Sequence, residues 1–236
     1  MYQQTVVVYY TKPLEDPEKR RAFITKTYTV LLIQFIFTAL VVAACTLLEP
    51  VKIWLKEHFY LIYVCMFLYL CCAILMCFCA EKLMTTNPTS VGVIVVLTIA
   101  EAGTLGFVTS TKAQEIVLIA AVATVACFFV LTIAGICCKF DFTGFMSVMF
   151  VIFLMIMLFG ILAAILHSYV PILRLIYACL GALAVCVYII IDTQLIMGGK
   201  RHQLEPEMYI LAAILLYIDL VMLFMYILEI AEYSKD

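Results

Sequence analysis

Charged residues are scarce in this 236-residue chain: Asp, Glu, Lys and Arg make up 13% of it, against roughly 25% in an average soluble domain. Neither sign dominates, because 14 Lys and Arg face 16 Asp and Glu. The lack of a basic excess excludes an electrostatic nucleic-acid binder. Hydrophobic residues make up 67% of the chain, more than one compact domain of this length can bury. The composition predicts a protein that crosses a membrane several times.

Long polar stretches are almost absent as well. Residues 1–27 form the one that exists, and they contain no apolar run followed by a cleavage site, so we expect no removable signal peptide. We expect a flexible tail here, with a short strand at Val6–Tyr10 as the alternative.

Seven apolar segments follow, each close to the ~20 residues that cross a ~30 Å hydrocarbon core as a helix. They lie at about 28–48, 59–79, 91–108, 116–137, 145–166, 172–197 and 208–230. We therefore predict an all-α membrane protein with a cytosolic N-terminal tail (1–27), a seven-helix transmembrane domain (28–230) and a short C-terminal tail (231–236). The connections, including 49–58, are too short for a soluble domain.

Basic residues near the segment ends predict the orientation. With seven spans, nine lie on the side of the N-terminus and five on the other, which places the N-terminus in the cytosol. The nine are Lys12, Lys19, Arg20, Arg21, Lys26, Lys82, Lys139, Lys200 and Arg201. The C-terminus stays open, since a last segment that re-enters would return it to the cytosol.

The eleven cysteines lie in or beside apolar runs rather than in polar loops. This placement excludes the disulfide framework of a small secreted fold, and no histidine stands at zinc-site spacing. We interpret the cysteines as small packing residues. Palmitoylation or redox sensitivity near Cys137 and Cys138 is the alternative.

Three acidic residues lie deep inside the apolar segments, away from the segment ends: Glu101, Asp192 and Asp219. A charge at mid-bilayer costs roughly 2.5–3.5 kcal/mol on the insertion scale, and no Lys or Arg lies in the core of any segment. At 1.5 Å per residue, Asp192 and Asp219 differ in depth by about one helical turn. Their segments are consecutive, so we expect the two side chains to face each other.

Two carboxyl groups in a dry site share a proton, because ionising both is costly. The shared proton would join the two helices, whereas its loss would separate them or recruit a cation such as calcium. This pattern predicts a pH-gated cation pathway. Other polar residues in the segments, such as Gln34 and Thr98, are interpreted as links between helices.

Several sequence motifs carry a family resemblance. YIIIDTQLIMGGK at 188–200, EPEMY at 205–209 and LYIDLVMLF at 216–224 resemble the Bax-inhibitor (Lifeguard) family of transmembrane proteins, as does KFDFT at 139–143 with Asp141 and Thr143. The stretch from Arg20 to Tyr28 is similar to that family's first helix.

The resemblance implies a seven-helix bundle with the last helix wrapped by the other six. It implies calcium leak from intracellular stores, pH sensing by Asp192 and Asp219, which would bind calcium transiently, and suppression of cell death. The expected membrane is the endoplasmic reticulum or Golgi, with the plasma membrane as the alternative. Expected partners are membrane lipid, calcium ions, and apoptosis-regulating and calcium-release-channel proteins; no cofactor is expected.

The chain departs from the family at Ile191 and Met222, where members often have tyrosine and asparagine. Some bacterial members also carry an arginine in the second span that pairs with the aspartates, and residues 59–79 contain no basic residue. Closure of the cation pathway would then depend on the shared proton or on the hydroxyls of Tyr188 and Tyr217. We place these two tyrosines on the ion pathway with Glu101.

Two alternatives remain open. One is a non-conducting regulator that binds cell-death or calcium-channel proteins. The other is an intramembrane aspartyl protease, since two aspartates on consecutive helices can activate water, although no Gly-x-Gly-Asp motif precedes Asp219. Receptor, retinal-protein and zinc-hydrolase motifs are absent, so we expect a protein that is not an enzyme.

Overall fold

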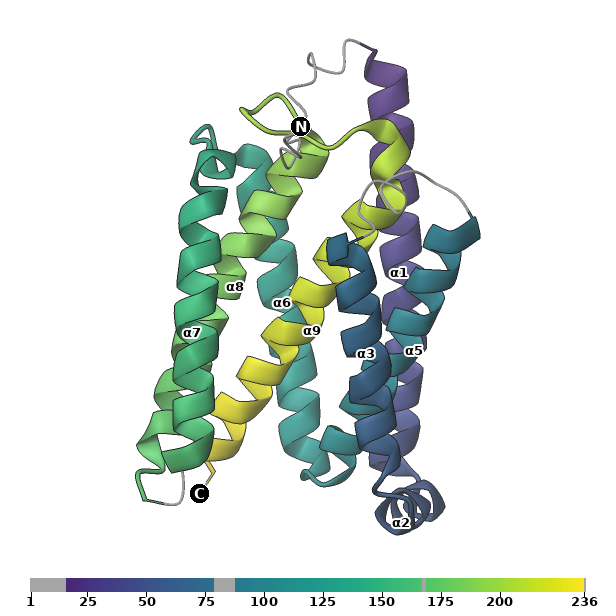
Figure 1. Cartoon of the computed structure of the whole chain (residues 1–236), viewed down its shortest axis with the longest axis vertical. Helices are drawn as coiled ribbons and strands as arrows, with labels where there is room; N and C mark the ends of the chain where they lie inside the picture. The colour runs from purple at the N-terminus through teal and green to yellow at the C-terminus, as the bar shows by residue number, and fades with distance from the viewer. Residues whose placement is uncertain (1–15, 79–87, 167–168, 236) are drawn as a thin grey trace, which may run out of the picture.

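The structure is a computed structural model that describes residues 16–78, 88–166 and 169–235. Over these residues it is helical, with no strand, which confirms the all-α prediction. Figure 1 shows long helices running side by side along one axis. The α-helices are α1 (Pro17–Leu47), α2 (Glu49–Glu57), α3 (Leu61–Phe78), α5 (Pro88–Ser110), α6 (Gln114–Cys137), α7 (Met146–Leu166), α8 (Ile172–Met197) and α9 (Tyr209–Tyr233), with 3-10 turns η1 (Phe142–Phe145) and η2 (Pro206–Met208).

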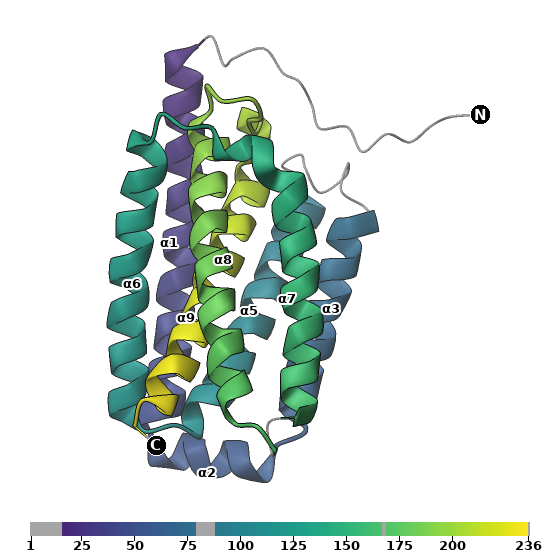
Figure 2. The same ribbon diagram turned by 90° about the vertical axis from the view of Figure 1, so that its left-hand side faces the viewer.

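Six helices of the described residues are long and apolar enough to cross a membrane. A seventh span results if α2 and α3, which meet at 81°, are counted as one. Residues 49–58, predicted as a connection, instead form α2, which lies across the end of the bundle (Figure 2). Pro50 in the first turn, Glu49 at the start and Lys56 at the end favour a short helix here.

Helix α1 begins eleven residues before the predicted span. The Asp16 carboxylate accepts a hydrogen bond from the Glu18 amide (3.0 Å), and Pro17 occupies the first turn. Residues 17–27 therefore belong to a helix and not to the flexible tail that we expected. The strand alternative at Val6–Tyr10 lies outside the described residues.

Helix α9 occupies the centre of the bundle. In its most apolar stretch 61% of the residues are buried, against 11% for the outer helix α7. It packs mainly on α1, α5, α6 and α8, while α3 packs chiefly on α5 and α7 on α8. The last helix is thus central, as the resemblance implied, and α3 and α7 lie in an outer layer.

The last helix crosses the whole bundle. Figures 1 and 2 show α9 beginning near the start of α1 and ending at the opposite end of the bundle, which is the end that carries α2. We call these the N-terminal end and the C-terminal end of the bundle. A re-entrant last segment would return to the end at which it began, and α9 does not.

Two of the described cysteines, Cys45 and Cys65, act as packing residues, whereas Cys127, Cys137 and Cys179 are exposed. All of these carry free thiols. A Cβ atom added to Gly103 or Gly106 of α5 would lie 2.7 Å from the sulfur of Cys65 or Cys45, respectively. Glycine on α5 therefore makes room for cysteine on α3 and α1, which brings these helices close together.

Candidate functional site

Asp192 and Asp219 meet at the interface of α8 and α9, the most extensive helix pair of the described chain. Each residue is 8% exposed, and the two carboxyl groups lie within interaction range of each other. The structure therefore brings together the two aspartates that the depth estimate paired.

The carboxyl pair lacks other donors. Oδ2 of Asp219 is buried, and no group in the described ranges forms a hydrogen bond with it. The ion pairs found among the described residues lie at helix ends and leave out both aspartates. Ionised carboxylates only accept hydrogen bonds, so a direct contact between two of them requires one proton. The arrangement fits a pair that holds a single proton.

Small residues let α8 and α9 approach closely. Ala178 on α8 and Ala212 and Ala213 on α9 are fully buried. Gly181 on α8 faces the ring of Tyr226 on α9, in a space that any Cβ atom would fill. This small-residue face, on the same side of α8 as Asp192, positions the two carboxyl groups in contact.

The hydroxyls of Tyr188 and Tyr217 are bonded away from the pair. Tyr188 donates to the Met149 carbonyl of α7 (2.8 Å). The Tyr217 hydroxyl shares a hydrogen bond with Thr38 of α1 (2.8 Å). Neither hydroxyl bonds to the carboxyl pair; instead each anchors α8 or α9 to a different outer neighbour.

Glu101 lies apart from the pair. With Thr104 it lines a cavity of about 910 Å³ formed by α3, α5, α7, α8 and α9. Thr98, one turn earlier on α5, accepts a hydrogen bond from Gln34 of α1 (2.8 Å), which confirms the interpretation of this polar contact as a link between helices.

Asp141 and Thr143 join the loop between α6 and α7 to the loop between α8 and α9. The Asp141 carboxylate accepts hydrogen bonds from the Thr143 amide (3.0 Å), the Thr143 hydroxyl (2.6 Å) and the Arg201 amide (2.8 Å). The Thr143 hydroxyl in turn accepts from the His202 amide (3.2 Å). We call this set, with Gln194 and Lys200 described next, the loop clasp.

Two residues that we did not single out complete the loop clasp. The buried side chain of Gln194 donates to the Phe140 carbonyl and accepts from the Phe142 amide, both at 2.9 Å. The Lys200 ammonium donates to the carbonyls of residues 138, 139 and 140 at 2.9–3.3 Å, where α6 has just ended. A lysine at a helix C-terminus satisfies free carbonyls and opposes the negative end of the helix dipole.

Glycine at 198 and 199 makes the loop clasp possible. Both residues have positive φ angles, 66° and 73°, and the Gly198 amide donates to the Gln194 carbonyl (2.8 Å). The left-handed conformation ends α8 and reverses the chain toward Lys200. The Gly-Gly-Lys order was the available signal for this turn, but its partner loop lies about 60 residues earlier.

The loop clasp lowers the pKa of the Asp141 carboxyl group. Burial alone would raise this pKa, but the hydrogen bonds from Thr143 and Arg201 and the nearby Lys200 charge outweigh burial and lower it below 3.8. Each of these donors favours the ionised form. The Asp141 carboxylate therefore stays charged throughout the neutral range.

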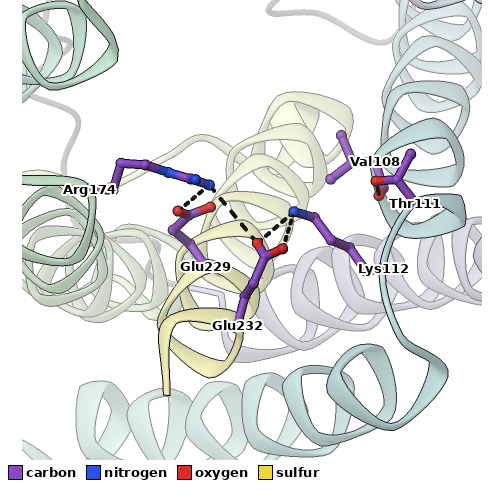
Figure 3. A network of polar contacts seen from close by, with 6 residues as sticks. All are labelled: Val108, Thr111, Lys112, Arg174, Glu229 and Glu232. Carbon is purple, nitrogen blue, oxygen red and sulfur yellow. Dashed lines mark hydrogen bonds and ion pairs between the residues drawn. The ribbon is translucent and has the colours of Figure 1, made fainter. Parts of the chain in front are cut away.

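A second charged network lies at the C-terminal end of the bundle (Figure 3). Lys112, in the turn between α5 and α6, pairs with Glu232 of α9 at 2.5 Å. Arg174 of α8 pairs with Glu229 of α9 at 2.5 Å and lies 4.0 Å from Glu232. Sequence reasoning missed this network, although opposite charges at adjacent segment ends were a signal for it.

Comparison with known proteins identifies the family. The family model described as "Inhibitor of apoptosis-promoting Bax1" matches residues 20–236. The chain belongs to this Bax-inhibitor family. The match includes the carboxyl pair and the loop clasp, and it confirms the resemblance drawn from the sequence motifs.

Similar relatives carry related names. The chain is 28% identical to protein lifeguard 3 of Mus musculus over 94% of its length and 72% of that protein. It is 27% identical to protein lifeguard 3 of Homo sapiens over 92% of its length and 70% of that protein. It is also 28% identical to the Golgi anti-apoptotic protein of Vaccinia virus (strain Lister), over 92% and 87% of the two chains.

Proposed function

We propose that this member of the Bax-inhibitor family is a pH-sensitive cation leak pathway that carries calcium and suppresses cell death. The observation that carries the proposal is the buried contact between the carboxyl groups of Asp192 and Asp219, which joins α8 to α9 without a basic partner among the described residues. Such a contact is stable with one proton and repulsive without it. The pair is therefore suited to couple pH to helix separation.

The anchoring of α8 and α9 gives this separation a direction. Tyr188 bonds α8 to α7, whereas Tyr217 bonds α9 to α1. When the carboxyl pair loses its proton, repulsion moves α8 with α7 away from α9 with α1. We assign Tyr188 and Tyr217 to the walls of the pathway for this reason.

Calcium suits the opened pair because it prefers oxygen ligands and completes its shell with water and carbonyl groups. Two carboxylates supply too few ligands for a permanent site, and no cluster of three or more His, Cys, Asp or Glu side chains forms within the described residues. The ion would bind transiently and pass on. Glu101, in the wall of the 910 Å³ cavity, is the second acidic group on the proposed route.

The biological setting follows from the relatives. The family description and the Golgi anti-apoptotic protein of Vaccinia virus support suppression of cell death, and the latter name supports a Golgi membrane. We expect the Golgi or the endoplasmic reticulum. The charge distribution supports a cytosolic N-terminus. We expect apoptosis-regulating and calcium-release-channel proteins as partners, no resident cofactor, and no enzymatic activity.

Reconstitution of the purified full-length chain in liposomes tests the proposal. Calcium flux should rise as pH increases through the titration of the pair, and Asp192→Asn or Asp219→Asn should flatten that dependence. Glu115→Gln, which removes an exposed carboxylate of α6, is the control and should leave the profile unchanged.

Each contrary result identifies another function. No calcium flux from correctly folded wild type would support a non-conducting regulator. Cleavage of a transmembrane peptide that Asp219→Asn abolishes would support the aspartyl protease. Flux with the same pH profile in both aspartate variants would overturn the gate itself.

A further inference from the structure

The cavity of about 910 Å³ lies on the outer side of the bundle, between α3 and α7, with α5, α8 and α9 behind it. Its α3 rim is exposed: Met66 is 53%, Phe67 64% and Leu70 54% exposed. Figure 1 shows α9 passing between the separate helices α7 and α3. The cavity therefore opens sideways, toward the medium around the helices.

That medium is the hydrocarbon of a bilayer at this depth. At 1.5 Å per residue, Gly160 of α7 lies about 9 Å from the C-terminal end of its helix and Met222 of α9 about 16 Å. One leaflet contributes about half of a ~30 Å hydrocarbon core. The cavity thus extends through the depth of one leaflet, from the C-terminal end of the bundle toward its middle.

Two opposite charges stand where this cavity reaches the membrane edge. Arg174 is in the first turn of α8, Glu229 is near the end of α9, and both line the cavity. They pair at 2.5 Å, with side chains that remain 45% and 27% exposed (Figure 3). This position is that of a lipid headgroup above its acyl chains.

The charges around Arg174 indicate which type of lipid headgroup fits this position. Lys112 and Arg174 face Glu229 and Glu232, so the network carries equal numbers of positive and negative side chains. An anionic lipid would add an unbalanced negative charge to this neutral network. A zwitterionic lipid can place its phosphate on Arg174 and its ammonium group on Glu229, which satisfies both members of the exposed pair.

The shape of the cavity fits a lipid with two chains. A second cavity of about 400 Å³ lies along α7 and shares Gly160, Tyr177 and Met222 with the first. The first cavity alone is within the usual size of ligand sites, about 300–1,000 Å³. Two adjoining apolar spaces beneath one polar network match two acyl chains beneath one headgroup.

We propose that this lateral cavity binds one zwitterionic phospholipid of the leaflet at the C-terminal end of the bundle, with its headgroup on Arg174 and Glu229 and its acyl chains between α3 and α7. Because Glu101 lines the same cavity, the lipid and a passing ion would occupy it in turn. This assignment does not depend on conduction, because a non-conducting regulator would bind the lipid equally well.

Photolabelling tests the site. The full chain is placed in nanodiscs that contain phosphatidylethanolamine with a photoactivatable acyl chain, and labelled peptides are mapped after irradiation. We expect label to concentrate on residues 66–70 of α3 and 157–164 of α7. Label spread evenly over the exposed faces of α1, α6 and α7 would show ordinary boundary lipid and would overturn the proposal.

Two plugging variants and one control sharpen the result. Ala163→Phe fills the buried wall of the cavity, and Leu70→Trp narrows its exposed rim without altering the core; either should lower labelling several-fold. Leu162→Phe, on the exposed face of α7 outside the lining, should leave labelling unchanged. Unchanged labelling in folded Leu70→Trp and Ala163→Phe would contradict the site.

Headgroup selectivity is tested with a matched phosphatidylglycerol probe. We expect it to label α3 and α7 several-fold less than the phosphatidylethanolamine probe, and we expect Arg174→Gln to weaken labelling by the latter. Equal or stronger labelling by the anionic probe would refute the zwitterion assignment. Absence of label from both cavity helices would indicate a water-filled cavity.

Discussion

The carboxyl pair and the loop clasp both use aspartate to attach α8 to its neighbours, yet they treat the carboxylate in opposite ways. Asp141 receives three hydrogen bonds and lies near Lys200. Asp192 and Asp219 are buried against each other, and Oδ2 of Asp219 has no hydrogen-bond partner in the described chain. The first arrangement is stable when ionised, whereas the second requires a proton. The surroundings of an aspartate thus decide whether it is suited to a fixed link, as at Asp141, or to the switch that we propose for Asp192 and Asp219.

The carboxyl pair and the loop clasp lie close together along α8. Asp192 lies six residues before Gly198, about 9 Å along α8 from the turn that begins the loop clasp. The clasp holds this end of α8 to the α6–α7 loop at every physiological pH. In the proposed mechanism, repulsion within the pair would therefore act on the contact between α8 and α9 while the loops stay joined.

The largest effect is expected at the switch. Asp219→Asn replaces one carboxyl by a neutral amide that can still bond Asp192, so helix packing should persist while the pH response disappears. Calcium flux in liposomes should change little across the pH range over which wild-type flux rises. A profile that keeps the wild-type midpoint would show that another group controls the response.

At the loop clasp, Asp141→Ala should lower stability without changing the pH response. It removes the acceptor for two backbone amides and one hydroxyl, a loss similar to that of a helix cap, about 1–2 kcal/mol. Thermal unfolding in detergent measures the loss, and flux measures the pH midpoint. A shifted midpoint would mean that the two regions do not act separately.

The stabilising effect of Asp141 should itself depend on pH only in acid. Its pKa in the folded chain is lowered, so its contribution is complete above its unfolded value, about 3.9, and is lost as pH falls through the lower folded value. The difference in melting temperature between wild type and Asp141→Ala should stay constant from about pH 5 to 8. A difference that shrinks toward pH 7 would contradict a pre-ionised carboxylate.

Gly198→Ala should weaken the loop clasp by distorting its turn. The backbone has φ of 66°, and a Cβ atom would lie 2.9 Å from Oε1 of Gln203. We expect a loss of about 1 kcal/mol, seen as a lower melting temperature. Gly92→Ala, where a Cβ atom would meet open space, is the matched control and should be neutral or stabilising.

The smallest effect is expected at the polar link between α1 and α5. Thr98→Val removes the acceptor of the Gln34 hydrogen bond while keeping the side-chain shape. Such links in membranes average about 0.6 kcal/mol, so the melting temperature should fall slightly. Loss of the pH response in this variant would extend the switch beyond α8 and α9.

The sequence predicts long apolar helices well. Both boundaries of α8 match the prediction, Ile172 to Met197, because Pro171 precedes its apolar run and Gly198 ends it. Helix α2 was missed because it is short and amphipathic, with no apolar run of membrane length. The early start of α1 was missed for a related reason: its first turns are polar and extend beyond the apolar segment.

The residues of the candidate site also differ in how far the sequence predicts their contacts. Depth along consecutive helices was enough to pair Asp192 with Asp219. The loop clasp depends on contacts between Gln194 or Lys200 and a loop more than 50 residues away, and these contacts come from tertiary packing. Periodicity and hydropathy carry no information on such contacts, so Asp141 and Thr143 were marked by family motif and not by mechanism.

The most direct test of the central claim is infrared spectroscopy of the protonated carboxyl band during a pH titration, in a Glu101→Gln background that removes the other acid of the apolar segments. The account predicts one protonated carboxyl at the pH where calcium flux is low, its loss in step with rising flux, and its absence from the matched Asp192→Asn and Asp219→Asn double variant. A protonated band that persists while flux rises, or that survives in the double variant, would contradict gating by a proton shared between Asp192 and Asp219.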